Sequence, residues 1–192
     1  MPRREWYVPL ISLKEAVEVA EVAYKTTGKR KRIAGEILAE RIGHSPSSST
    51  FIRKLYSIKR YGLLDLKVKR EKVEGKSRVS VEYCELTELA LKILAPLDEA
   101  EKQRSLVKAF LNVPLFNELY ERYKGSALPS SETIEALLVR EYEVAPDEAS
   151  KVLELFIESA RYAGLLREGP EGLRLLVAEE ISLSLIHIYE PT

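Results

Sequence analysis

The residues with the clearest capacity for chemistry lie in one short stretch, 49–60, which reads STFIRKLYSIKR. Phe51, Leu55 and Ile58 recur at helical spacing and would face a core, so the hydrophilic residues would face outward or flank that side. An arginine can pair with both acceptors of a guanine edge, and serine, threonine or lysine can bind phosphates or base edges. The candidates for DNA contact in this stretch are Ser49, Thr50, Arg53, Lys54, Ser57 and Arg60.

Basic residues are concentrated around this stretch, although the whole chain has 30 Lys and Arg, 30 Asp and Glu and no net charge. Residues 25–72 hold fourteen basic and four acidic side chains, whereas residues 132–180 hold twelve acidic and five basic ones. This asymmetry favours a polyanion partner for the first part and a different task for the second. The alternative is a solvated basic face on a structural domain. Further candidates for DNA contact are Lys29, Arg30, Lys31, Arg32, Lys67, Lys69, Arg70 and Lys76.

Side chains for catalysis or metal binding are sparse. His44 stands in a Ser-rich turn without a Cys, Asp or second His at the spacing of a metal site or catalytic triad, and no Gly-rich phosphate loop occurs. The single cysteine, Cys84, favours a packing role in a reducing compartment. No apolar run approaches the ~20 residues of a membrane span. We therefore expect a cytoplasmic protein that is not an enzyme, has no membrane contact and uses no metal or cofactor.

Two segments of the chain resemble each other. Residues 51–64 read FIRKLYSIKRYGLL and residues 156–166 read FIESARYAGLL. Each passes through Arg-Tyr to a glycine, Gly62 or Gly164, which suits a left-handed helix C-cap, and then to Leu-Leu. The repetition predicts two copies of one small domain, with Arg161 as the equivalent of Arg60.

In the first copy, helical spacing predicts helices over 12–24, 33–42 and 48–61. The first would begin with a capping box. After the third, the period changes to alternation, which indicates a two-stranded hairpin with a charged tip, and a helix over 86–94 closes the unit. The apolar face of the second helix would consist of Ile33, Ile37, Leu38 and Ile42.

The second copy is expected to follow the same order and to end in a short hairpin around 169–172. Pro146 suits the first turn of its third helix. Residues 96–112 have apolar positions to bury and predict a helix between the copies instead of a flexible linker, and Phe110 and Phe116 are interpreted as core residues. We expect the two copies to pack together. The helices of the second copy are predicted over 113–123, 131–142 and 146–162.

Three helices followed by a hairpin is the order of a winged helix, a helix-turn-helix variant whose hairpin is the wing. Residues 7–177 resemble an uncharacterised prokaryotic tandem winged-helix family in the Arg-Tyr-Gly-Leu stretch, a Leu-Thr-Glu-Leu helix at 86–89 and the pair Leu128 and Pro129. The resemblance implies a mainly α fold with small β-hairpins and no catalytic residues. The expected units are a winged-helix domain over 7–95, a linker helix over 96–112 and a second winged-helix domain over 113–180.

The function expected from these features is binding of double-stranded DNA, in transcription regulation, by the third helix and the basic wing of the first domain. The alternative is a non-enzymatic scaffold subunit that binds other proteins in a chromosome-organising or defence complex. The third helix of the second domain carries Asp147, Glu148, Glu154 and Glu158, which would repel phosphate. This domain is expected to form a homodimer, to bind a protein partner or only to pack against the first.

The last residues, 183–192, read LSLIHIYEPT and resemble the translation of a sequencing adapter. The match covers 183–188 and 190–192, with Tyr189 where serine is expected. A translated adapter carries no information about the fold of the protein. We expect that it replaces the native C-terminus and that His187 has no function.

Overall fold

A computed structural model describes residues 8–28, 31–73, 76–170 and 172–177, except the side chains of residues 71–73 and 76–78. Within these residues the chain forms eight α-helices and two small antiparallel sheets. The expected mainly helical fold with small hairpins is confirmed at this level. The adapter-like tail over 183–192 lies outside the described residues.

The first half of the described chain leads from a long helix through a small sheet to a short closing helix. Its elements are α1 (Leu13–Thr26), β1 (Arg32–Ala34), α2 (Gly35–Arg41), α3 (Ser49–Arg60), β2 (Leu64–Val73), β3 (Lys76–Leu86) and α4 (Glu88–Leu94). The strands pair in the order β1-β3-β2. Ile33, Cys84 and Leu66 lie opposite one another across the sheet and pack into the core.

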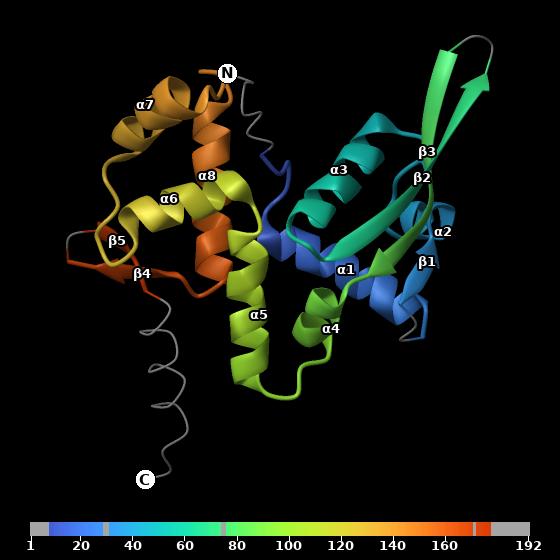
Figure 1. Ribbon diagram of the computed structural model, residues 1–192, viewed down its shortest axis with the longest axis horizontal. Helices are drawn as coiled ribbons and strands as arrows, with labels where there is room; N and C mark the ends of the chain where they lie inside the picture. Colours follow the sequence, from blue (N-terminus) through green and yellow to red (C-terminus); the bar gives the residue numbers. More distant parts are fainter. Residues whose placement is uncertain (1–7, 29–30, 74–75, 171, 178–192) are drawn as a thin grey trace.

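The second half has a similar order of elements on a smaller scale. Its elements are α5 (Glu99–Leu111), α6 (Pro114–Tyr123), α7 (Ser131–Tyr142), α8 (Ala149–Tyr162), β4 (Leu166–Gly169) and β5 (Gly172–Leu175). An isolated bridge joins Ala127 to Arg174, between α6 and α7, where the first half has β1 between α1 and α2. Figure 1 shows α6, α7 and α8 at one end of the molecule and the β2–β3 hairpin at the other.

Capping side chains begin most of the predicted helices where the sequence indicates. In five helices the N-cap side chain accepts a hydrogen bond from the backbone N–H three residues later. Such a bond satisfies one of the donors that a helix start leaves unpaired. These N-cap residues are Ser12, Ser48, Thr87, Asp98 and Ser130.

The predicted second helix, over 33–42, is wrong in its start and in its apolar face. Ile33 is buried in β1, and α2 begins only at Gly35. Ile37, expected to be buried, is 46% exposed. The pairing of β1 with β3 sets where α2 begins. A Cβ at residue 35 would overlap the carbonyl group of Val81, so only glycine lets the start of α2 lie this close to β3. A short strand set by a distant partner has no local signal.

The predicted start of the last long helix at Pro146 is also wrong, because α8 begins at Ala149. The backbone N–H of Glu148 donates to the carbonyl oxygen of Ala145 at 2.9 Å, so a turn precedes the helix. The short hairpin that follows α8 falls where it is predicted, as β4 and β5.

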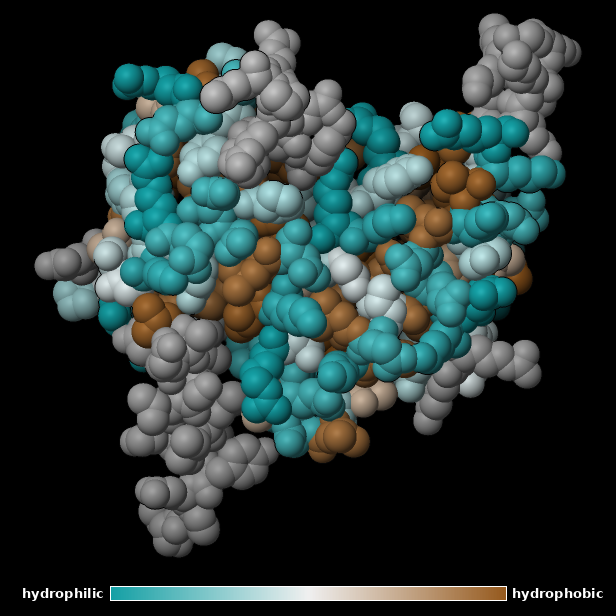
Figure 2. All heavy atoms as spheres, viewed as in Figure 1, coloured by the Kyte–Doolittle hydropathy of each residue, from teal (hydrophilic) through white to brown (hydrophobic). Residues whose placement is uncertain are grey.

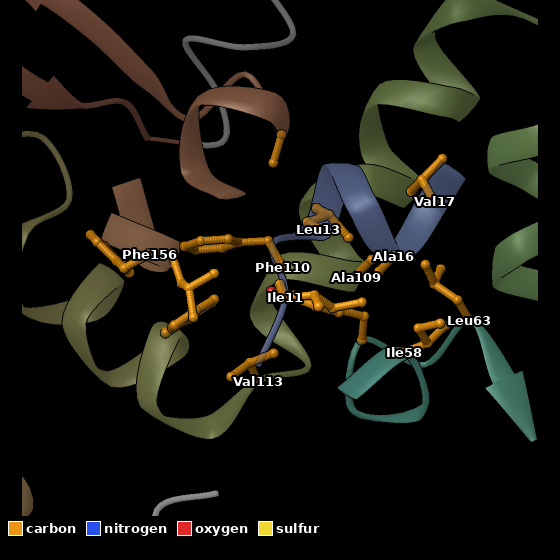
Figure 3. Close-up of a cluster of buried hydrophobic side chains, with 14 of the residues drawn as sticks. Ile11, Leu13, Ala16, Val17, Ile58, Leu63, Ala109, Phe110, Val113 and Phe156 are labelled. Atoms are coloured by element: carbon orange, nitrogen blue, oxygen red, sulfur yellow. Dashed lines mark hydrogen bonds between the residues drawn. The ribbon is translucent and has the colours of Figure 1, made fainter. Parts of the chain in front are cut away.

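One hydrophobic core runs through both halves, as expected from the apolar positions of residues 96–112. Phe110 of α5 lies with its ring centroid 5.4 Å from Phe116 of α6 and 5.6 Å from Phe156 of α8. Figure 3 shows Phe110 and Phe156 beside Ile11 and Leu13, which precede and begin α1. Since α1 contacts α3 and α4 as well as α8, the two halves pack together.

The segment before α1 is held by one serine from each half. The backbone N–H of Leu10 donates to Ser57 Oγ of α3 at 2.9 Å, and that of Leu13 donates to Ser159 Oγ of α8 at 3.0 Å. Both serines are fully buried. The segment therefore links α3 to α8 through its own backbone, and the two serines occupy equivalent positions in the repeat.

The ends of α3 and α8 correct the predicted alignment of the repeats. Each helix ends before a glycine with positive φ, 76° at Gly62 and 67° at Gly164. Counted back from these glycines, Arg161 corresponds to Lys59, so its predicted equivalence with Arg60 is wrong. The two Arg-Tyr pairs are identical in sequence, but the second lies one residue further from its helix-ending glycine than the first.

Helix α5 closes both of these helix ends with amide side chains. Asn112 Nδ2 donates to the carbonyl oxygen of Tyr61 at 3.0 Å, and Gln103 Nε2 donates to that of Ala163. Both acceptors belong to C-cap residues, whose carbonyl groups lack partners within their own helices. A Cβ at Gly62 would lie 2.5 Å from Asn112 Nδ2, so the glycine also makes room for this contact.

Candidate nucleic-acid interface

Helix α3 buries one side and exposes another. Phe51, Leu55 and Ile58 are fully buried, as their spacing predicts. Of the predicted contacts, Ser49, Thr50 and Arg53 are exposed and lie in the first half of the helix. The exposed side of α3 consists of Ser49, Thr50, Arg53, Tyr56 and Lys59.

Two of these exposed residues, Tyr56 and Lys59, are missing from the predicted set. Tyr56 is 37% exposed and lies three residues after Arg53, so the two side chains share a face of α3. A tyrosine hydroxyl can donate a hydrogen bond to a phosphate, and a lysine can bind one as a point charge. The helical spacing of the buried residues would have identified both positions.

The other three residues predicted on this helix serve the fold. Ser57 is fully buried and binds the segment before α1, so the prediction of an outward side chain is wrong. Lys54 Nζ lies 2.6 Å from Glu15 Oε1 of α1. Arg60 Nη1 donates to the carbonyl oxygen of Val8 at 3.1 Å, and partial burial lowers the pKa of this guanidinium. The segment before α1 covers this side of α3, which the sequence of α3 alone does not show.

The described part of the basic turn is paired with carboxylates. Lys31 Nζ forms an ion pair with Glu88 of α4. Arg32 belongs to β1 instead of a turn, and its Nη2 lies 2.9 Å from Glu85 Oε2 while its guanidinium carbon lies 4.2 Å from the ring centroid of Tyr83. The hydrogen bond to Glu85 raises the pKa of Arg32. Both cations are exposed, but each already has a partner.

The β2–β3 hairpin extends away from the body of the molecule (Figure 1) and carries further exposed cations. Lys67, Lys69 and Arg70 of β2 are exposed, and β2 is an outer strand of the sheet. Figure 2 shows hydrophilic residues at the upper right, in the region of this hairpin, beside a patch of hydrophobic ones. Among the predicted contacts, Lys29, Arg30 and the side chain of Lys76 lie outside what the structure describes.

The exposed charges of α8 balance, because Glu154 and Glu158 stand against Lys151 and Arg161. The prediction placed Asp147 and Glu148 on this helix as well, but both lie in the turn before it. Glu154 Oε2 lies 3.0 Å from Lys151 Nζ, and Glu158 Oε1 accepts a hydrogen bond from Ser12 Oγ at 3.0 Å. Arg161 Nη2 lies 3.8 Å from Glu168 Oε1, so its charge is balanced locally. This face carries no net charge, whereas the exposed charges of α3, Arg53 and Lys59, are all basic.

Cys84 and His44, the two residues considered for catalysis or metal binding, both lie against apolar surroundings. Cys84 is fully buried, and burial raises the pKa of its thiol to about 12 because the thiolate is poorly solvated there. The His44 ring lies 6.2 Å from that of Phe51. In the described ranges no group of His, Cys, Asp and Glu could hold a metal ion, and no described helix has the length and apolar character to cross a bilayer.

Comparison with models of protein families, with curated proteins and with solved structures found no match to this chain.

Proposed function

We propose that this chain binds double-stranded DNA, as a transcription regulator, and consists of two tandem winged-helix domains over 7–95 and 113–180. The order α1-β1-α2-α3-β2-β3, with β1 paired to the hairpin, supports this assignment for the first domain. The second half supports it through its matching order and through the bridge at Ala127. On this proposal the chain belongs with the prokaryotic tandem winged-helix proteins that its sequence resembles.

The observation that carries the proposal is a group of available cations on two neighbouring elements, α3 and β2; Lys14, Arg41 and Lys92 also make no ion pair in the described chain, but each stands on a different helix. The cations of the first half that face the interior or the sheet are held by carboxylates or by backbone. By contrast, four exposed cations on α3 and β2 make no ion pair with any other described residue. Phosphates can recruit such cations without breaking a contact of the fold. The four are Arg53, Lys59, Lys67 and Arg70.

In the proposed complex, the first half of α3 enters the major groove and the hairpin lies along the adjacent backbone. Arg53 reads a base edge, while Ser49 and Thr50 bind phosphate at the start of the helix. Lys67 and Arg70 bind phosphates from β2. The second half, which is net acidic over residues 132–180, stays away from the duplex.

Fluorescence anisotropy with a labelled random-sequence duplex tests the proposal. Contact with about five phosphates predicts a slope near −4 to −5 in a plot of log affinity against log salt. Replacing Arg53 and Lys59 by Glu should abolish binding at ~50 mM salt, since each change removes an attraction and adds a repulsion. The matched control is Arg104→Glu with Lys108→Glu on the exposed side of α5, which should still bind. If the unchanged protein fails to bind at this salt concentration, the scaffold alternative is favoured.

A further inference from the structure

An open groove between α7 and α8 is lined by both carboxylate and apolar side chains. Its volume is about 410 Å³. Leu153 and Ile157 contribute apolar surface. The charged residues that line the groove are Glu135, Glu154, Glu158 and Arg161, and Glu154 is also paired with Lys151 in an exposed ion pair. Glu135 forms no ion pair with another described residue, and Arg161 is already shared with Glu168. The groove is thus suited to a basic segment with an aliphatic stem.

The same chain carries a segment of that chemistry. The β2–β3 hairpin extends from the body, and Lys67 and Arg70 on it are exposed cations without a carboxylate partner among the described residues. Their side chains combine methylene stems with charged ends. The cations of α3, in contrast, lie on a helix packed against the body, which is less able to enter a groove.

One molecule cannot place its own hairpin in its own groove. Figure 1, drawn with the longest axis horizontal, places the hairpin and α7 at opposite ends of the molecule. The two surfaces can meet only between copies. The balanced total of 30 basic and 30 acidic residues, separated between the halves, makes such a contact electrostatically complementary.

We propose that the β2–β3 hairpin of one copy docks in the α7–α8 groove of a second copy. Lys67 and Arg70 point to opposite faces of β2, so one pairs with Glu135 on α7 and the other with Glu154 on α8. Glu154 exchanges its exposed ion pair with Lys151 for this contact, and the stem of the cation beside α8 lies on Leu153 and Ile157. The contact joins unlike surfaces, so it is head-to-tail and can extend to further copies. It does not depend on the proposed DNA binding. If both occur, DNA competes with the groove for the same hairpin cations.

Sedimentation velocity of the full chain tests the contact. At ~0.05 M salt the average sedimentation coefficient should rise with protein concentration, and at ~1 M salt, where the Debye length is about 3 Å, the protein should be monomeric. Apolar association of any other segment would persist at high salt. A monomer at ~0.05 M salt up to the highest soluble concentration would overturn the proposal.

Two charge-reversed variants make the test specific. The groove variant Glu135→Lys with Glu154→Lys and the hairpin variant Lys67→Glu with Arg70→Glu should each be monomeric alone. Their equimolar mixture should associate again, because the intact hairpin of one variant meets the intact groove of the other, and the two reversed surfaces are also opposite in charge. The control Arg104→Glu with Lys108→Glu should associate like the unchanged protein. A mixture that stays monomeric contradicts the head-to-tail contact.

Neutral variants keep the test decisive if charge reversal disturbs folding. Glu135→Gln with Glu154→Gln should weaken association at least tenfold at ~0.05 M salt, with an unchanged melting temperature. Association that is unaffected by these changes refutes the groove as the contact. Binding of a synthetic Lys- and Leu-rich peptide to the groove without self-association would assign the groove to another basic protein, and the proposal for a second copy would be wrong. DNA binding is measured in a separate experiment, so a failure to bind DNA does not change how the association experiments are interpreted.

Discussion

Arg53 and Arg60 stand on the same helix with the same charge, but their surroundings give them different tasks. Arg53 is exposed and has no ion-pair partner in the described chain. Arg60 holds the carbonyl group of Val8, and its burial lowers its pKa. A guanidinium that is bound to the backbone must give up this bond to reach a phosphate. The fold therefore separates two residues that the sequence presents alike.

Alanine substitutions should separate the two arginines by experiment. We expect Arg53→Ala to lower DNA affinity by about 1–3 kcal/mol and to leave the free energy of unfolding nearly unchanged. Arg60→Ala should instead lower the free energy of unfolding by about 1 kcal/mol, with the smaller effect on DNA affinity. Anisotropy titrations and urea unfolding measure the two quantities. Equal losses of DNA affinity would show that both side chains contact the duplex.

Because the Cys84 thiol is buried, the free energy of unfolding should depend on pH in the alkaline range. Its pKa in the folded protein is raised to about 12, whereas an unfolded cysteine titrates near 8.5. Above pH ~8.5 the unfolded chain loses this proton while the folded chain keeps it, so the free energy of unfolding falls as pH rises toward 12. Below pH ~8.5 both states hold the proton, and this group adds no pH dependence.

Urea unfolding at pH ~7.5 and ~9.5 should therefore show a loss of about 1 kcal/mol at the higher pH. The variant Cys84→Val removes the titrating group and should reduce this difference. A thiol reagent should modify Cys84 only as fast as the protein unfolds. Rapid modification of the native protein would contradict its burial.

At the scale of elements, α5 and the segment before α1 connect equivalent points of the two repeats. The segment bonds to Ser57 and Ser159, and α5 supplies amides to the ends of α3 and α8. Tyr61 adds a third link, because its hydroxyl donates to the carbonyl oxygen of Ile11 at 2.9 Å and lies 3.2 Å from Ser159 Oγ. The third helices of the two units are thus joined by specific polar contacts as well as by apolar packing.

Two glycines in the same position after a helix test the contribution of α5. Gly43 and Gly62 each follow the C-cap residue of a helix, and both have a positive φ, of 71° and 76°. A Cβ added at Gly43 would meet no atom within 4 Å, whereas a Cβ added at Gly62 would meet the side chain of Asn112. Gly43→Ala should lower the free energy of unfolding by about 1–2 kcal/mol through backbone strain alone. Gly62→Ala should lower it further, by about 1 kcal/mol, because the hydrogen bond from Asn112 is displaced.

Chemical denaturation of both variants measures the difference. Adding Asn112→Ala to Gly62→Ala should have little further effect, since the contact is already lost. If Gly43→Ala and Gly62→Ala destabilise the protein equally, the amide contact contributes nothing.

At the scale of the whole molecule, the continuous core determines how the protein unfolds. Phe110, Phe116 and Phe156 pack together, and the same buried cluster extends through α1 to Phe51 and Tyr61. Two repeats that share a core cannot lose it independently. We expect the described chain to unfold as one cooperative unit despite its internal repetition.

The substitution Phe110→Ala tests this cooperativity. It should lower the free energy of unfolding by about 3–5 kcal/mol, and hydrogen exchange should show similar losses of protection in α3 and α8. The control Leu97→Ala changes a side chain that is 91% exposed and should have almost no effect. Loss of protection in α8 alone would mean that the halves unfold separately.

The sequence by itself determined most of the helices, the residues that begin them and the glycines that end α3 and α8. These features depend on contacts between residues three to five positions apart, so helical spacing, capping side chains and glycine conformation are readable locally. The same applies to the core positions of α3, where Phe51, Leu55 and Ile58 are buried as their spacing predicts.

Only the tertiary structure decided which basic residues remain available and where the first sheet begins. Lys54 faces Glu15, Arg60 holds Val8 and Ile33 pairs with β3, and each of these partners is distant in sequence. A side chain on a helix can turn toward either flank within the same local pattern, and a three-residue strand is stable only when its partner is present. The composition of a surface can therefore be predicted from the chain, but the pairing of its charges depends on long-range packing.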